Sequence, residues 1–113
     1  MVELLEAAVG YSATGTLPGT GVEMTLTEIE YGDRRFVFSR ALMVRVLEEE
    51  CGWAFETDTH ELVGFGYTRE EAELAFRQDF AACWDRIALG DERKMTQGAI
   101  NLKQALLALA KEV

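Results

Sequence analysis

Few residues of this chain are of a type that could do chemistry. His60 is the only histidine, and it stands among Asp58, Thr59 and Glu61. A lone imidazole beside carboxylates is typical of an exposed turn. A zinc site needs three or four nitrogen or sulfur ligands, and neither cysteine has ligand spacing to His60. We therefore expect no metal and no cofactor.

Nucleophilic catalysis has no better candidates. It needs a serine, cysteine or threonine together with a base and an orienting group. His60 is the only imidazole, and Ser12 and Ser39 have no flanking signature. The glycine-rich segment 10–21 lacks the Gly-Lys-Ser/Thr sequence of a phosphate-binding loop, and no helix is expected to open after it. The sequence indicates no catalytic residues and a protein that is not an enzyme.

The balance of charge favours a basic partner. The formal net charge is −9 at pH 7, which opposes binding to nucleic acid and attracts basic proteins. Many soluble proteins are simply acidic, so the charge alone does not decide between these interpretations. A local basic cluster is expected to pair with acidic residues of neighbouring strands; its members are Arg34, Arg35, Arg40 and Arg45.

Length and composition indicate one folded, cytoplasmic domain. The chain has 113 residues, 49% of them hydrophobic, and a single proline. No run approaches the ~18 apolar residues of a membrane span. Glu3 and Glu6 stand where a signal peptide would carry basic residues. In a reducing compartment Cys51 and Cys83 are expected as free thiols, with Cys83 a small buried hydrophobe.

The first two thirds of the chain show a strand pattern. Residues 1–21 form an N-terminal arm and a glycine-rich loop, and 22–113 form a single domain. Alternation of apolar and polar residues begins at Val22 and shifts near Glu28, which indicates a bulge. Strands are expected at 22–31, 35–39, 42–47, 53–57 and 61–66.

A long amphipathic helix is expected from Thr68 to about Leu89. Thr68 and Glu71 have the spacing of a capping box, and Gly90 would follow the last turn. Gly64 and Gly66, two residues apart on the preceding strand, would let this helix approach the sheet closely, or would form a ligand platform. Its apolar stripe consists of Ala72, Phe76, Phe80, Cys83, Trp84 and Ile87.

Thr96 is expected to cap a second, leucine-rich helix that runs to Val113. It would pack on the sheet, on the first helix or on a second copy of the chain. The sequence thus predicts an α+β fold, an antiparallel meander of about four strands packed by one long helix, with a second C-terminal helix. The expected core consists of Phe36, Phe38, Val44, Val46, Phe55, Leu62, Phe76, Phe80, Trp84 and Ile87.

The segment Gly66-Tyr67-Thr68-Arg69-Glu70-Glu71-Ala72, which follows the strands, resembles the end of the HicB-like antitoxin domain. Small uncharacterised bacterial proteins carry a similar element. The resemblance covers roughly residues 34–113. It implies an α/β fold partly like that of double-stranded-RNA-binding domains, oligomerisation, and neutralisation of a small basic ribonuclease toxin.

The expected function is therefore that of a non-catalytic protein-binding module with an acidic surface for a small basic protein. The alternatives are a homo-oligomeric protein of another role, and a small-ligand binder or enzyme that uses the Arg34–Arg45 region or the Gly64–Gly66 platform. Neither nucleic acid nor membrane is an expected partner. The candidate partner-binding residues are Glu48, Glu49, Glu50, Leu102, Leu106 and Leu109.

Overall fold

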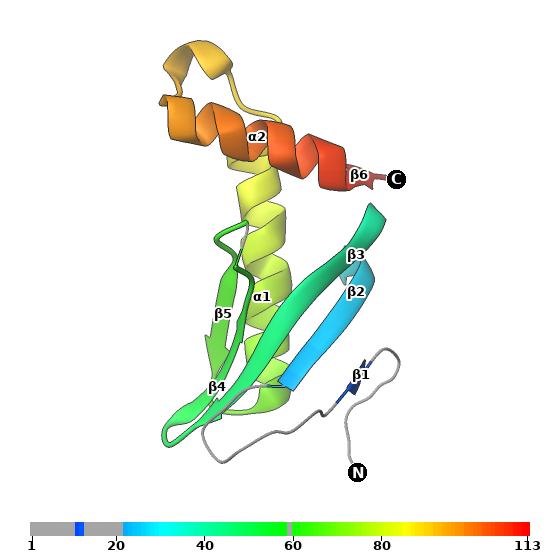
Figure 1. The fold of residues 1–113 in the computed structure, drawn as a ribbon, viewed down its shortest axis with the longest axis vertical. Helices are drawn as coiled ribbons and strands as arrows, with labels where there is room; N and C mark the ends of the chain where they lie inside the picture. The colour runs from blue at the N-terminus through cyan, green and yellow to red at the C-terminus, as the bar shows by residue number, and fades with distance from the viewer. Residues whose placement is uncertain (1–10, 13–21, 59) are drawn as a thin grey trace.

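The computed structural model describes residues 11–12, 22–58 and 60–113. Five strands follow one another as an antiparallel meander, and a sixth joins its middle (Figure 1). A long helix and a second C-terminal helix complete the expected α+β fold. In chain order the elements are β1 (Tyr11–Ser12), β2 (Val22–Tyr31), β3 (Arg34–Glu49), β4 (Gly52–Glu56), β5 (Val63–Gly66), α1 (Arg69–Cys83), the π-helical turn η1 (Trp84–Ala88), the 3₁₀ turn η2 (Glu92–Lys94), α2 (Gln97–Leu109) and β6 (Ala110–Glu112).

The expected arm and glycine-rich loop of residues 1–21 lie outside the described residues, with one exception. Tyr11 and Ser12, which were expected in the loop, form β1 and pair with Met24 and Glu23 of β2.

β3 is one long strand with a bulge, not the two strands expected at 35–39 and 42–47. Leu26 of β2 pairs with Leu42, but Glu28 pairs with Val37. Residues 38–41 of β3 therefore lie opposite Thr27 alone, so the bulge expected near Glu28 is present and its extra residues belong to β3. A bulge bends its strand, and β3 pairs with β4 on one side of this bulge and with β6 on the other.

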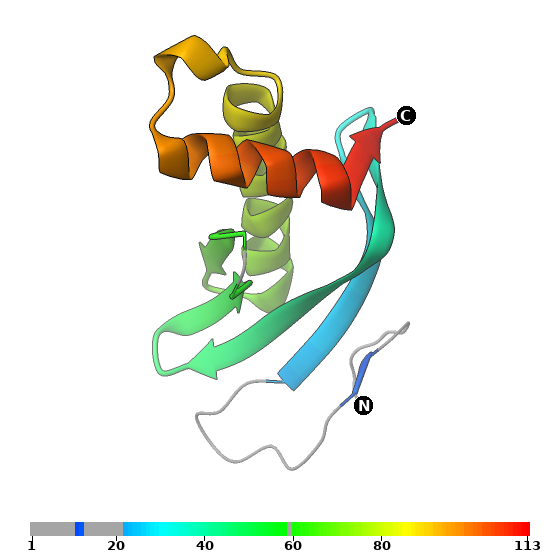
Figure 2. The ribbon, with the colours of Figure 1, turned by 45° about the horizontal axis from the view of Figure 1, so that its top comes forward.

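The two halves of β3 have different partners on one side. Residues 45–49 pair with β4, whereas residues 36–38 pair with β6. Figure 2 shows β6 continuing directly from α2 along β3. The expectation that α2 runs to Val113 is wrong, because the helix ends at Leu109 and Val113 N–H donates to Arg35 O at 3.0 Å.

α1 packs so closely on β5 that only glycine fits between them. A Cβ atom on Gly64 would lie 2.2 Å from Phe76 N, and one on Gly66 would lie 2.5 Å from Ala72 N. The structural interpretation of the two glycines is therefore confirmed. The helix occupies the space that a ligand on this platform would need.

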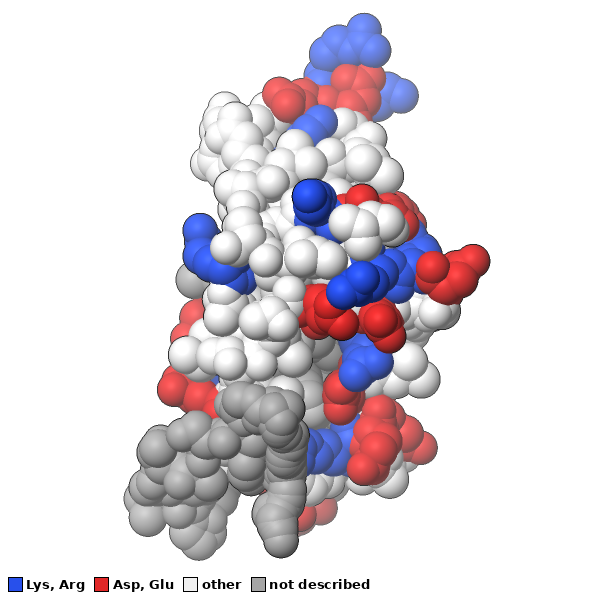
Figure 3. Space-filling model, turned by 90° about the vertical axis from the view of Figure 1, so that its right-hand side faces the viewer, with Lys and Arg blue, Asp and Glu red and all other residues white. Residues whose placement is uncertain are grey.

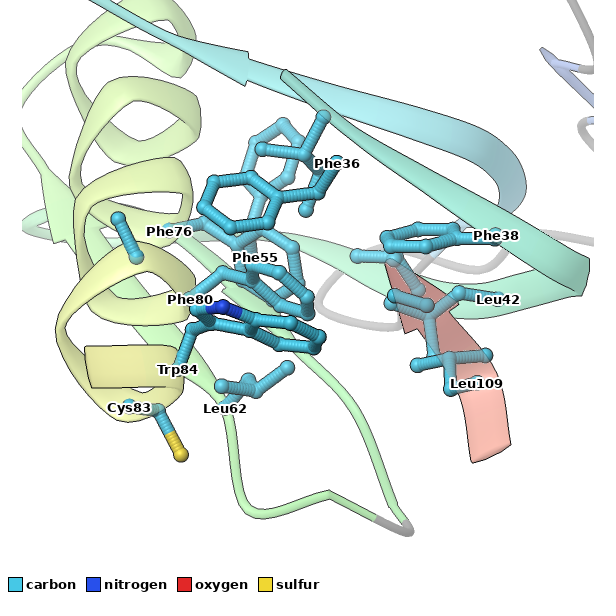
Figure 4. Packing of buried hydrophobic residues seen from close by; sticks show 14 of the residues in the cluster. Phe36, Phe38, Leu42, Phe55, Leu62, Phe76, Phe80, Cys83, Trp84 and Leu109 are labelled. Atoms are coloured by element: carbon cyan, nitrogen blue, oxygen red, sulfur yellow. The ribbon is translucent and has the colours of Figure 1, made fainter. Parts of the chain in front are cut away.

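Aromatic rings fill the core between α1 and the sheet (Figure 4). Phe36 of β3 contacts Phe80 and Trp84 edge-on, with ring centroids 5.1 and 5.5 Å apart. Phe55 lies against Phe76. All expected core residues are buried except Ile87, which is partly buried against the same cluster.

Local capping signals fix both helices. Thr68 and Glu71 form the expected capping box at the start of α1, and Thr96 accepts from Ala99 N–H at the start of α2. Gly90 does not have the left-handed conformation of a typical C′ residue. It is required for space, because a Cβ there would lie 2.3 Å from Arg86 O.

Candidate functional site

The expected acidic run lies where β3 ends and turns into β4. Glu48, Glu49 and Glu50 are all exposed. None of the three forms an ion pair or side-chain hydrogen bond with a described residue. Three adjacent carboxylates without an internal cation repel one another, so an external cation at this end of the sheet would be attracted.

Most of the arginine cluster, by contrast, is already neutralised. Arg35 bonds Glu28 at 2.7 Å, and Arg45 bonds Glu56 at 2.7 Å, so pairing with neighbouring strands is confirmed for these two. The hydrogen bonds raise the pKa of both guanidinium groups above its ordinary value. Figure 3 shows basic and acidic side chains lying next to one another over one face of the molecule.

Arg34 links the C-terminal strand β6 to η1. Its guanidinium bonds Asp85 at 2.8 Å and Glu112 of β6 at 2.9 Å. The hydrogen bonds from Arg34 lower the pKa of both carboxyl groups. Arg40 is exposed and has no carboxylate partner among the described residues.

A shallow aromatic hollow adjoins the acidic run. Its volume is about 350 Å³. Phe65 and Tyr67, which line it, are 65% and 86% exposed. Soluble proteins seldom leave adjacent large rings in water without a use. The lining consists of Glu49, Cys51, Gly52, Trp53, Phe65, Gly66 and Tyr67.

Two glycines make the floor of this hollow rigid. Gly52 has φ +151°, a conformation that favours glycine, and a Cβ there would lie 2.4 Å from Gly66 O. Gly66 in turn is pressed against the first turn of α1. The hollow is thus formed by backbone that has little freedom to rearrange.

Two of the three leucines expected to bind a partner are not available for that role. Leu106 and Leu109 are fully buried in the chain's own core, where α2 covers η1 and β3. Leu102 is partly buried against the same cluster. The apolar periodicity of α2 is present as expected. Because this chain itself covers the apolar face, the expectation that Leu106 and Leu109 bind a partner is wrong.

A second hollow, of about 250 Å³, lies near the β3 bulge and is more polar. It is lined in part by Arg40, Arg45, Asp58 and His60. Arg45 is already held by Glu56 and Asp58, so its charge is not free for a ligand.

His60 is buried, only 3% exposed, and the expectation of an exposed turn residue is wrong. Burial, with a contribution from the charge of Arg40, lowers the pKa of its imidazole. The neighbouring Glu61 takes a left-handed conformation with φ +54°. No local sequence signal indicates the burial of His60.

Among residues 22–58 and 60–113, no cluster of three or more histidine, cysteine or acidic side chains has the arrangement of a metal site. Cys51 is exposed, Cys83 is buried, and both are free. Burial raises the pKa of the Cys83 thiol. In the part of the chain that the structure describes, no helix combines the length and apolarity of a bilayer crossing.

No protein-family model, curated protein or solved structure matches this chain. The resemblance to the HicB-like domain therefore stays a prediction. Among the described residues, the acidic run and its aromatic hollow combine unpaired charge with exposed apolar area.

Proposed function

We propose that this protein is a non-catalytic binding module that captures a small basic protein, as an antitoxin of the HicB-like type would. The observation that carries the proposal is the position of Glu48, Glu49 and Glu50. They are exposed, have no cationic partner in the part of the chain that the structure describes, and adjoin an exposed aromatic hollow. Protein interfaces combine such aromatic anchors with a charged rim.

Charge supplies the specificity of this interaction. The net charge of −9 steers a basic partner toward the molecule, and the free carboxylates select the face. A basic ribonuclease would also lose its attraction for RNA when its cationic groups are covered. The proposed role requires no catalytic residue of this chain.

The test is capture from the native lysate by the tagged protein at 50 mM and 1 M salt, read by mass spectrometry. One small basic protein in near-equal amount, retained at low salt and weakened at high salt, is the expected result, because 1 M salt screens charges beyond about 3 Å. Recovery of the bait alone would overturn the proposal. Self-association of the bait at both salts would favour a homo-oligomer instead.

Matched variants locate the surface. The triple change Glu48→Gln, Glu49→Gln and Glu50→Gln should weaken capture about tenfold, since exposed ion pairs contribute a few tenths to 1 kcal/mol each. The control removes the same charge elsewhere. It carries Glu30→Gln, Asp33→Asn and Glu61→Gln, all at exposed positions, and should bind like the wild type. Equal loss in both variants would show that only net charge matters.

A further inference from the structure

The aromatic hollow beside the acidic run is exposed on a rigid frame. The N–H groups of Tyr67 and Thr68 donate to Glu71 Oε1 at 2.9 and 3.3 Å. The backbone of Tyr67 is therefore fixed by the capping box while its ring is left in water. A ligand that packs on the ring therefore has to order only its two side-chain torsions and not the backbone that carries it.

The neighbouring sheet edge is closed to a further strand. Thr57 N–H donates to Leu62 O. Because hydrogen-bonded and non-hydrogen-bonded pairs alternate along an antiparallel ladder, the amides of Val63 and Phe65 on β5 point away from β4, toward the open edge of the sheet. Val63 N–H donates to Asp79 Oδ2 at 3.0 Å. Phe65 N–H follows, and the third outward amide, that of Tyr67, donates to Glu71 of α1.

Two of three successive outward donors are thus occupied by carboxylates of α1. A strand added to β5 would have to break both bonds and approach the two charges. A site that accepts an added strand needs the reverse, an edge whose backbone N–H and C=O groups are free to pair. Binding at this end of the sheet must therefore use side chains of the partner.

Elsewhere in the molecule an arginine already packs on an aromatic ring that has carboxylates beside it. The guanidinium carbon of Arg34 lies 5.1 Å from the centroid of the Phe36 ring. Asp85 and Glu112 accept its N–H groups at the rim. The described residues that line the hollow offer the same combination and include no cation, since Glu49 borders rings that include Tyr67.

From these observations we infer that the hollow is a receptor for an arginine side chain of the basic partner, which stacks on Tyr67 and bonds Glu49. This inference rests on the proposed function and deepens it. A guanidinium is favoured over an ammonium because it stacks flat on a ring and bonds a carboxylate through two N–H groups. The partner is held by inserted arginine, not by strand addition.

The test uses the full chain and three probes of equal length, hexaarginine, hexalysine and uncharged hexacitrulline. Amide chemical shifts are followed by NMR during titration at 50 mM salt. We expect hexaarginine to shift the amides of Phe65, Gly66 and Tyr67 and to bind two- to fivefold more tightly than hexalysine, the range of an exposed cation–π contact. Hexacitrulline should not bind.

Two variants make the result specific. Tyr67→Leu keeps an apolar side chain but should abolish the preference for arginine over lysine, a two- to fivefold loss. Leu89→Ala removes an exposed apolar residue just after η1 and should leave the titration unchanged. Equal affinity for both cationic peptides with no effect of Tyr67→Leu would overturn the inference. So would slowed hydrogen exchange of Phe65 N–H, which would show strand addition.

The inference and the proposed function fail in different ways. If a basic protein is captured through the glutamates but Tyr67→Leu has no effect on either probe, the arginine receptor is wrong and the module stands. If hexaarginine binds in the hollow but the lysate yields no basic protein, the receptor stands and the proposed function is wrong.

Discussion

The contact between α1 and β5 yields a sharp prediction for Gly64→Ala. The added Cβ would lie 2.2 Å from Phe76 N, 2.5 Å from Ala72 O and 2.6 Å from Phe76 Cα. These are backbone atoms in the middle of a helix, so no side chain can rotate aside. Ordinary contacts are about 3.5–4 Å, and α1 must withdraw by about 1 Å. Because overpacking costs about 1–3 kcal/mol and occasionally more, we expect a loss near 3 kcal/mol.

The same substitution at Gly98 is the matched control. A Cβ there meets only Thr96 Oγ1 at 3.9 Å, inside α2, so Gly98→Ala should stabilise the protein by about 0.5–1 kcal/mol. Both variants are measured by urea unfolding monitored by circular dichroism. A loss below 1 kcal/mol for Gly64→Ala, or equal signs for the two variants, would refute the reasoning that close backbone approach fixes this helix.

Three further predictions concern pH and capping. Burial lowers the pKa of His60, so the unfolded chain binds the proton more readily; the free energy of unfolding should fall as the pH drops below about 6.5, by at most about 1.4 kcal/mol per pH unit. Urea unfolding at pH 7 and 5.5 measures this, and an unchanged slope in His60→Gln would contradict it. Ser39 Oγ donates to Ala108 O at 2.7 Å at the end of α2, and Ser39→Ala should cost about 1 kcal/mol, seen as faster hydrogen exchange in the last turn. Thr68→Ala should cost about 1 kcal/mol in thermal unfolding, with Thr68→Ser near wild type; equal losses would argue against the cap.

Features set by local spacing were predictable from the sequence. The capping box of Thr68 and Glu71 depends on residues three apart. The apolar stripe of α1 repeats at helical period, and Gly64 and Gly66 share a face because strand side chains alternate. Each of these signals is short-range, and the structure confirms each.

Features set by distant pairing were not predictable. Residues 110–112 favour helix by composition, yet they form β6 because residues 36–38 offer an open edge beyond the bulge. The burial of His60 is not marked by any local pattern, since the residues around it are polar and typical of a turn. For α2, the sequence marks Leu106 and Leu109 as apolar but does not say which surface covers them.

Of the candidate site, the acidic run was predictable from the sequence and the hollow was not. The run of Glu48, Glu49 and Glu50 is visible as consecutive charge, and its place at the strand end follows from the turn. The hollow beside it is assembled from β4 and from residues 65–67, which come together only through the β4–β5 pairing. Glycines 52 and 66 were a possible signal, since both adjoin aromatic residues.

The central claim, that a basic protein covers the acidic run and the hollow, is tested most directly at Cys51. This exposed thiol lines the hollow, and the other cysteine, Cys83, is buried, so alkylation in the native state reports on this surface. The rate of Cys51 modification by iodoacetamide, followed by intact mass, should fall at least tenfold when the captured basic protein is bound and should recover at 1 M salt. An unchanged rate in a salt-sensitive complex would show that the partner binds elsewhere and would contradict the claim.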